Sequence, residues 1–142
     1  MINIKKQAPA LKVRPGPNDS NARGDVFGGW LMSQIDIAAS ITACDVTNGS
    51  TATRAVDGLV FLQPIYTYDI VSFYTEVLAI GSTSITIKTE VYVQRMNEMN
   101  APKLDEWIKT AEATLVFVAI NKPGEKRMIA EMSKEILKGK MK

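Results

Sequence analysis

The segment GDVFGGWLMSQIDIAASITACDVTNG, residues 24–49, has the pattern of one long helix. Apolar or small residues recur along it every three or four positions, which is the spacing of one helix face. These positions are Phe27, Leu31, Ile35, Ala38 or Ala39, Thr42 and Val46. Asn48 and Gly49 are residue types that terminate helices and predict its end. Because alanines make much of the remaining surface small, this helix should pack on several sides.

Long β-rich segments with short connections follow the helix, which favours an antiparallel sheet. The expected strands are residues 52–63, 70–80, 83–95 and 110–121, with a short strand near Leu11–Arg14. In 83–95, Ile85, Ile87, Val91 and Val93 face one side, and Lys88, Glu90 and Gln94 face the other. Gly58 is a candidate β-bulge. Segment 110–121 is apolar on both faces, as in a strand covered on each side.

A curved antiparallel sheet wrapped around the helix accounts for this order of elements. We therefore predict an α+β fold with one domain spanning residues 1–142. We expect residues 1–10 and 131–142 at the two ends to be frayed tails. The second of these segments could instead form a short terminal helix. A length of 142 residues fits a single domain of ordinary size.

Composition excludes several functional classes. The chain is 46% hydrophobic and 23% charged, which is typical of a globular protein. A net charge of +2 gives no argument for nucleic acid as a partner. No stretch approaches the ~20 apolar residues of a membrane helix, so no membrane partner is expected. The first residues lack the apolar core of a secretion signal, and we expect a cytoplasmic protein.

The chain contains no histidine and one cysteine, Cys44. A Ser-His-Asp triad, a cysteine–histidine pair and a histidine-based dehydratase are therefore excluded. One cysteine cannot supply the usual zinc ligands, so no metal site is expected. Cys44 itself is interpreted as a small buried hydrophobic residue. Catalysis would have to use carboxylates, hydroxyls, lysines or backbone N–H groups.

Three sequence blocks resemble the YciA-type acyl-CoA thioesterases of the hotdog superfamily. They are NARGDVFGGWLMSQID (21–36), AVDGLVFLQPI (55–65) and GSTSITIKTEVYV (81–93), and the resemblance runs from about Pro17 to about Arg127. The first block is the specific one, with family residues at Asn21, Gly24, Asp25, Phe27, Gly28, Gly29, Trp30, Met32 and Asp36.

The resemblance implies a hotdog fold and hydrolysis of acyl-CoA to a free acid and coenzyme A. It also implies homodimers paired through their sheet edges, associated further as trimers of dimers. No cofactor is expected, because coenzyme A is part of the substrate and the product. The alternative is a non-catalytic acyl-CoA-binding or regulatory hotdog module, which would keep the groove and lose the chemistry.

The chain departs from the family pattern at several positions. Tyr68 precedes Asp69 where a glycine is frequent, Gln63 replaces a frequent lysine, and Tyr92 replaces a frequent tryptophan. Residues 94–107, QRMNEMNAPKLDEW, are also unlike most relatives. These changes leave the helix block untouched, so they bear on substrate detail more than on reaction class.

Asp36 is a carboxylate on a mostly apolar helix, where it is costly unless it is solvated, paired or functional. Burial would raise its pKa, which suits a general base. A bond to a neighbouring hydroxyl or amide, or a place at an exposed end of the helix, would explain it equally well from the pattern alone. The resemblance favours catalysis by Asp36, as general base or as nucleophile.

The start of the helix is the second candidate catalytic element. The first N–H groups of a helix have no internal partner and attract a developing anion. N–H groups near Gly28, Gly29 and Trp30 could hold the thioester oxyanion, although a glycine pair also serves tight packing. Asp25 is either the helix N-cap or, as the resemblance implies, a group that orients water or the thioester.

Spacing predicts that Asp25 and Asp36 act on one substrate only between two chains. They are 36 − 25 = 11 residues apart. At the rise of a helix, the helical part of this gap spans roughly 10–16 Å, too far for one reacting carbon. Asp36 of one chain would therefore meet the helix start of another.

Coenzyme A needs donors around its phosphates. Candidates are the hydroxyls and turn N–H groups of Ser82, Thr83 and Ser84 and the cations Lys88, Arg95 and Arg127, although each cation also suits a solvated surface. The acyl chain needs an apolar slot beside the helix, for which the candidates are Val56, Leu59 and Phe61, with Asp57 reaching the same region.

Overall fold

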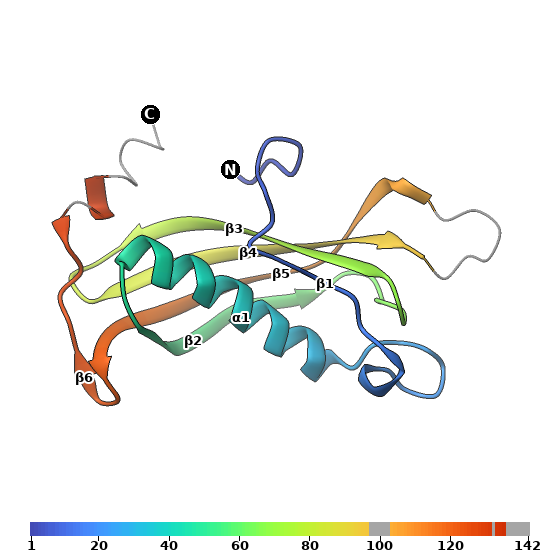
Figure 1. The fold of residues 1–142 in the computed structure, drawn as a ribbon, viewed down its shortest axis with the longest axis horizontal. Helices are drawn as coiled ribbons and strands as arrows, with labels where there is room; N and C mark the ends of the chain where they lie inside the picture. The colour runs from blue at the N-terminus through green and yellow to red at the C-terminus, as the bar shows by residue number, and fades with distance from the viewer. Residues whose placement is uncertain (97–102, 132, 136–142) are drawn as a thin grey trace.

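The computed structural model describes residues 1–96, 103–131 and 133–135 of the chain (Figure 1). Its elements are β1 (Leu11–Val13), η1 (Pro17–Asp19), α1 (Gly28–Thr47), β2 (Thr51–Phe61), β3 (Ile70–Ile80), β4 (Ser84–Arg95), β5 (Lys103–Lys122) and β6 (Glu125–Lys126). The strands form one antiparallel sheet in the order β1-β3-β4-β5-β2, with β6 paired to β5.

The helix α1 lies along one face of this sheet and contacts β2, β3, β4 and β5 (Figure 1). One long helix against a large antiparallel sheet confirms the predicted α+β hotdog architecture. No helix in the described part of the chain is long and apolar enough to cross a membrane.

The helix ends where the sequence predicts and begins later than Asp25. Asn48 has φ 56°, the left-handed conformation that closes a helix, and the Gly49 N–H donates to the Cys44 carbonyl. The N-cap is Phe27 in an extended conformation, and no side chain of the described residues caps this end. The interpretation of Asp25 as N-cap is therefore wrong, because the helix starts three residues after it.

The core lies between α1 and the inner face of the sheet. The alternation predicted for β4 is confirmed, since Ile85, Ile87, Val91 and Val93 are all fully buried in this core. Small residues let the helix approach the sheet closely. Fully or almost fully buried members from the other elements are Leu31, Ile35, Ala38, Ala39, Ala43, Val71, Phe73, Ala111, Ala113, Leu115, Phe117 and Ala119.

The outer face of the sheet carries a polar network. The Tyr92 hydroxyl donates to Glu90 at 2.8 Å, and burial, together with this bond, raises the pKa of Tyr92 to about 12. Lys109 bonds Glu112 at 2.8 Å, which raises the pKa of the lysine and lowers that of the glutamate. These bonds pair charged and polar side chains of β4 and β5 on the outer face.

The two ends of the chain are held to the domain over the residues that the structure describes. The Met1 ammonium lies 3.0 Å from Glu76, and the Gln7 side chain donates to the Thr75 carbonyl. Near the other end, the Ser133 hydroxyl donates to the Val46 carbonyl. The prediction for residues 131–142 falls mostly outside the described residues.

Strand β5 begins at Lys103, seven residues before the predicted start at 110. Residues 103–109 mix charged and apolar types without clear alternation, so their pattern does not reveal a strand. They pair with the end of β4 through a bulge, with Val93 opposite Ile108 and Arg95 opposite Lys103. Within the unusual segment, residues 94–95 and 103–107 thus extend β4 and β5, and residues 97–102 lie outside the described residues.

One side of α1 is not covered by the sheet. Met32, Ile37 and Ile41 are large apolar helix residues that stay exposed, and Val56 is exposed on the side of β2 that faces the helix. β2 is the last strand of the sheet, so its outer edge is unpaired within the described chain. The helix was predicted to pack on several sides. In a single chain it packs only on the side that faces the sheet.

Candidate active site

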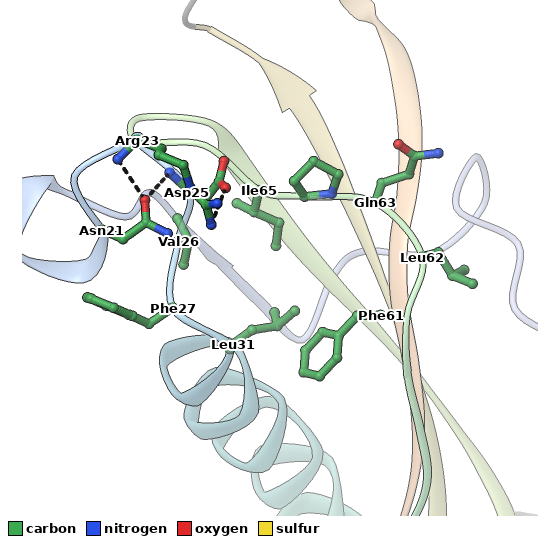
Figure 2. Close-up of a pocket in the computed structure, with 12 residues that line it drawn as sticks. Asn21, Arg23, Asp25, Val26, Phe27, Leu31, Phe61, Leu62, Gln63 and Ile65 are labelled. Atoms are coloured by element: carbon green, nitrogen blue, oxygen red, sulfur yellow. Dashed lines mark hydrogen bonds and ion pairs between the residues drawn. The ribbon is translucent and has the colours of Figure 1, made fainter.

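The loop before α1, the first turn of the helix and the segment after β2 enclose a pocket of about 480 Å³ (Figure 2). Its lining residues are Asn21, Arg23, Asp25, Val26, Phe27, Gly28, Leu31, Phe61, Leu62, Gln63, Pro64 and Ile65. Figure 2 shows the ring of Phe61 directed toward the first turn of α1, and a Cβ on Gly28 would lie 3.6 Å from that ring. We call this cavity the helix-start pocket. One of its walls is apolar, and the other is the polar loop before α1.

Gly28 and Gly29 open the helix at this pocket. As the first N–H groups of the helix, they have no carbonyl partner within it, and no described side chain caps them. A Cβ on Gly29 would meet nothing within 4 Å, so its backbone is open to approach. The Trp30 N–H differs, because it donates to the Phe27 carbonyl at 3.1 Å. The two glycines are thus the better placed of the three predicted oxyanion donors.

Asp25 lies in the loop that precedes the helix. Its carboxylate is 3.3 Å from the guanidinium of Arg23, and its N–H donates to the side-chain oxygen of Asn21 at 3.2 Å (Figure 2). The same Asn21 oxygen accepts the Arg23 N–H at 2.9 Å. The Asn21 side chain therefore holds the backbone of this loop. The sequence signal for this role is an asparagine three residues before a glycine, since both residue types favour turns.

Asp36 lies at the seam between α1 and β2, and its carboxylate is half-buried. The hydroxyl of Thr53 on β2 donates to Asp36 Oδ1 at 2.6 Å. A bond to a neighbouring hydroxyl, the competing explanation for this carboxylate, is thus present. It does not exclude catalysis, because such a bond orients a carboxylate that still has acceptor capacity.

Thr53 is the site residue that sequence reasoning missed. The ladder between β2 and β5 shifts between Thr53 and Ala55, so Thr53 lies opposite Phe117 and Val56 lies opposite Leu115. Phe117 and Leu115 both belong to the core, and directly paired residues share a face. Thr53 and Val56 therefore both face the helix, which simple alternation would not predict.

An apolar slot of about 250 Å³ lies beside Asp36. It is lined by Met32, Ile35, Val56, Leu59 and Leu115. Two of the predicted acyl-contacting residues, Val56 and Leu59, are in this wall. Phe61 instead lines the helix-start pocket, and Asp57 lies opposite Thr114, which faces the outer side of the sheet. The structure does not bring Asp57 to the slot, because it directly follows Val56 on the strand and so points to the opposite face.

The turn between β3 and β4 lies near the C-terminal end of α1. Its backbone is held by two other segments: the Ile129 N–H, after β6, donates to the Ser82 carbonyl, and the Ala119 N–H, on β5, donates to the Thr83 carbonyl. Arg127 comes to the same end of the molecule. Its guanidinium donates to the carbonyls of Thr47, Ser50 and Ile120 and to the Thr47 hydroxyl. These bonds connect the end of α1, the residue before β2 and the end of β5.

The structure does not bring the three predicted cations together. Arg95 ends β4, and Ser84 begins it, so about 37 Å of strand separates them. Arg95 pairs at 2.5 Å with Asp69, which is fully buried, and stacks over Tyr66 at 4.7 Å. Lys88 lies on the outer face, 3.5 Å from Glu90. No single coenzyme A on one chain would reach all of them.

The two predicted catalytic carboxylates also stay apart. Asp36 lies eight residues after Gly28, or about 12 Å along the helix axis, and Asp25 lies before that start. The prediction that they act together only between two chains stays a prediction. Its structural basis is the uncovered seam, where Asp36 and the unpaired edge of β2 lie next to each other.

The chain is similar to known proteins in sequence and in fold. The thioesterase superfamily pattern matches residues 23–99. The acyl-CoA thioester hydrolase YciA of Salmonella typhimurium is 36% identical over 127 residues, covering 89% of this chain and 93% of the relative. A hexameric hotdog fold thioesterase of Campylobacter jejuni superposes with a TM-score of 0.85 at 34% identity, covering 93% and 97% of the two chains.

A second solved structure, HI0827, is a hexameric broad specificity acyl-coenzyme A thioesterase. It is 35% identical, with a TM-score of 0.83 over 96% of this chain and 91% of that chain. These matches span almost the full length of both partners and include the helix block that carries Asp36. The chain therefore belongs to the thioesterase superfamily, among the YciA-type acyl-CoA thioester hydrolases with the hotdog fold.

Proposed function

We propose that this protein hydrolyses acyl-CoA thioesters with Asp36 as its central catalytic group. The observation that carries the proposal is the Asp36 carboxylate, held at 2.6 Å by Thr53 and placed beside an apolar slot on an uncovered seam. The relatives' activity supports the substrate, since they are named acyl-CoA thioester hydrolases and one is of broad specificity.

In this mechanism Asp36 accepts a proton from water as the water oxygen adds to the thioester carbonyl. The resulting oxyanion accepts hydrogen bonds from the N–H groups of Gly28 and Gly29 of a second copy of the chain, each contributing ~3 kcal/mol to transition-state stabilisation. Collapse of the tetrahedral intermediate breaks the C–S bond, and the proton on Asp36 passes to the departing thiolate. Direct attack by Asp36, which would form a mixed anhydride, leads to the same products.

Isotope-labelled water separates these two routes. In a single turnover, general-base catalysis places the label in the product acid only. Attack by Asp36 places label in the enzyme carboxylate when the anhydride is hydrolysed at that carbon. Mass spectrometry of the peptide that contains Asp36 reads the outcome.

The active site is proposed to form between two copies of the chain. Edge strands that expose apolar side chains are unfavourable in isolation. On the side of β2 that faces α1, Val56 and Phe61 are exposed, and Met32 and Ile41 are exposed on the helix. Pairing β2 with a second β2 would cover this surface. The Campylobacter jejuni thioesterase and HI0827 are hexameric, which supports three such dimers in one assembly.

Replacement of Asp36 by Asn tests the proposal. Asn keeps the size and the bond to Thr53 but cannot accept a proton, so turnover of an acyl-CoA panel should fall by about 10²–10⁴-fold. Thiol release measures the rate. Asp45→Asn, an exposed acid on the same helix, is the matched control and should keep full activity. Near-normal turnover by the Asp36→Asn variant would sink the assignment.

A further inference from the structure

The loop that carries Asp25 is held by the segment that connects β2 to β3. On one side of Asp25, the Val26 N–H donates to the Ile65 carbonyl at 2.8 Å. On the other side, the Gly24 carbonyl accepts the Thr67 N–H at 3.0 Å. Ile65 and Asp25 both line the helix-start pocket (Figure 2). Because the two bonds flank Asp25, the place of its carboxylate before α1 depends on where the connecting segment lies.

Two further contacts join the connecting segment to this loop. Tyr66 lies opposite Asp25 in a short antiparallel bridge. The Thr67 hydroxyl lies 2.8 Å from the Ser20 hydroxyl oxygen and 3.3 Å from the Gly24 carbonyl oxygen. The loop itself lies between η1 and α1. The connecting segment therefore supports it through side chains as well as through backbone groups.

A buried ion pair fixes the connecting segment in turn. Asp69, the last residue before β3, is fully buried. Its carboxylate accepts hydrogen bonds from the Arg95 guanidinium, from the Tyr66 N–H at 2.8 Å and from the Met96 N–H at 3.3 Å. The Arg95 guanidinium also lies over the Tyr66 ring, 4.7 Å from its centre. A buried polar group with its bonds satisfied is rigid, so this pair ties the residue opposite Asp25 to the end of β4.

We infer that Asp69 and Arg95 are positioning residues, which hold Asp25 and the helix start of their own chain in the geometry that catalysis requires. The inference rests on the proposed function and adds two residues to it. Neither residue is among those that line the helix-start pocket, so both act through the connecting segment. Displacement of a reacting group by about 1 Å lowers a rate by about 100-fold, which sets the scale of the expected effect.

Replacement of Arg95 by Met tests the positioning role, because it keeps an extended side chain and removes the charge. We expect kcat to fall by about 10–100-fold and KM to change by less than about threefold. Arg95→Lys restores a cation for Asp69 and should recover most of the lost kcat. Lys109→Met removes a cation that bonds Glu112 on the outer face, and this matched control should keep full kcat. A raised KM with unchanged kcat would make Arg95 a coenzyme A contact and overturn the inference.

A second variant covers the case in which Arg95→Met does not fold, since it leaves Asp69 buried without its partner. Thr67→Val keeps the shape of the side chain and removes the hydroxyl that reaches Ser20. We expect kcat to fall by about 3–10-fold. Thr114→Val, on the outer face of β5, is the matched control and should keep full kcat. Wild-type kcat in the Thr67→Val variant would overturn the role of the connecting segment.

Mixed dimers separate positioning from a general loss of stability. In the proposed site, Asp36 of one chain faces Asp25 and the helix start of the other. Co-expression of Arg95→Met with Asp36→Asn leaves one fully intact site in each mixed dimer, so about a quarter of wild-type activity should return. Co-expression of Arg95→Met with Asp25→Ala leaves no intact site and should recover nothing. Equal activity of the two mixtures would show that Arg95→Met is merely less stable and would overturn the inference.

The same two mixtures can be made with Thr67→Val in place of Arg95→Met. The mixture with Asp36→Asn should then be about threefold more active than the mixture with Asp25→Ala. Equal activities would again overturn the inference.

The proposed function fails separately. Wild-type enzyme that hydrolyses no acyl-CoA contradicts thioesterase activity. The reference mixture, Asp36→Asn with Asp25→Ala, leaves Arg95 unchanged, and its failure to recover activity contradicts the shared site. Recovery in the reference mixture together with equal activity of the two Arg95 mixtures keeps the shared site and overturns only the positioning role.

Discussion

Tyr68 has a backbone conformation that a tyrosine rarely adopts. Its φ is 69°, in the left-handed region. Two contacts hold it there, since its N–H donates to the Pro15 carbonyl at 2.8 Å and its own carbonyl accepts from Arg14 at 3.0 Å. The turn delivers the next residue, Asp69, to the buried pair with Arg95. A glycine at this position would adopt the same conformation without strain.

Tyr68→Gly should therefore stabilise the protein by about 0.5–1 kcal/mol. Relief of left-handed strain outweighs the greater chain entropy of glycine in the unfolded state and the loss of the Arg14 stack on the ring. Thermal unfolding should show a midpoint raised by a few degrees. Tyr68→Phe keeps the Cβ and should leave the midpoint unchanged; a lower midpoint for the glycine variant would contradict the strain.

Thr53 is expected to position the Asp36 carboxylate. Thr53→Val keeps the shape and removes the hydroxyl that donates at 2.6 Å. Loss of an orienting hydrogen bond should lower kcat by about 10–100-fold and leave KM nearly unchanged, because binding does not require it. Steady-state kinetics measures both constants.

Thr53→Ser is the matched variant, because it restores the hydroxyl and should recover most of kcat. Thr53 is exposed in the single chain, so its replacement should not disturb folding. A valine variant with wild-type kcat would show that the Asp36–Thr53 bond has no catalytic part.

At the scale of elements, Arg127 closes the C-terminal end of α1. A cation at this end is favourable for the helix dipole, and the guanidinium also donates at 2.9 Å to the Thr47 carbonyl. Gly49 is required by this contact, because a Cβ there would lie 2.7 Å from Arg127 Nη2. The hydrogen-bond donors of Arg127 are thus largely occupied by groups of its own chain.

Arg127→Met should lower the free energy of unfolding by about 2–3 kcal/mol, since it leaves helix-end carbonyls without their donor. Chemical denaturation measures the change. Arg54→Met, at an exposed arginine of β2, is the control and should shift stability by less than about 0.5 kcal/mol. Unchanged stability in the Arg127 variant, together with a raised KM for acyl-CoA, would contradict this role and support the alternative that Arg127 binds coenzyme A.

Strand β2 shows how bulges decide which residues meet the substrate. The ladder shifts once between Thr53 and Ala55 and again between Asp57 and Val60. Gly58 takes φ 63° inside the second shift, which confirms the bulge predicted at that glycine. The first shift has no glycine or proline to signal it in the sequence. It is the shift that turns Thr53 toward Asp36.

At the scale of the whole molecule, one chain does not complete the proposed site. Asp36 lies in the third turn of α1, and Asp25 lies before its first turn. If each site takes Asp36 from one chain and Asp25 from its partner, two defective variants should complement each other. Co-expression of Asp36→Asn with Asp25→Ala leaves one intact site in each mixed dimer.

Random association makes half of all dimers mixed, so the co-expressed pair should recover about a quarter of wild-type activity. Each variant alone should be nearly inactive. Co-expression of Asp36→Asn with Asp36→Ala is the control and should recover nothing. Activity of the mixed preparation no higher than the mean of its parents would contradict a site shared between chains.

Much of the fold follows from local pattern. The helix end at Asn48 and Gly49, the two faces of β4 and the bulge at Gly58 each depend on side chains within a few positions of one another. Such features are local, because periodicity and turn preference act over neighbouring residues. The start of β5 did not follow, since residues 103–109 become a strand only by pairing with β4.

The sequence by itself determined the long helix, the antiparallel pairing of the strands and the family, since these depend on spacing and residue type. It also singled out Asp36 as the candidate catalytic acid. The tertiary structure alone decided that Thr53 bonds Asp36, that Asp57 faces away from the slot, and that Arg127 and Arg95 bind groups of their own chain. The physical reason is register. These contacts join residues far apart in the chain, and one extra residue in a strand reverses which side chains face the helix.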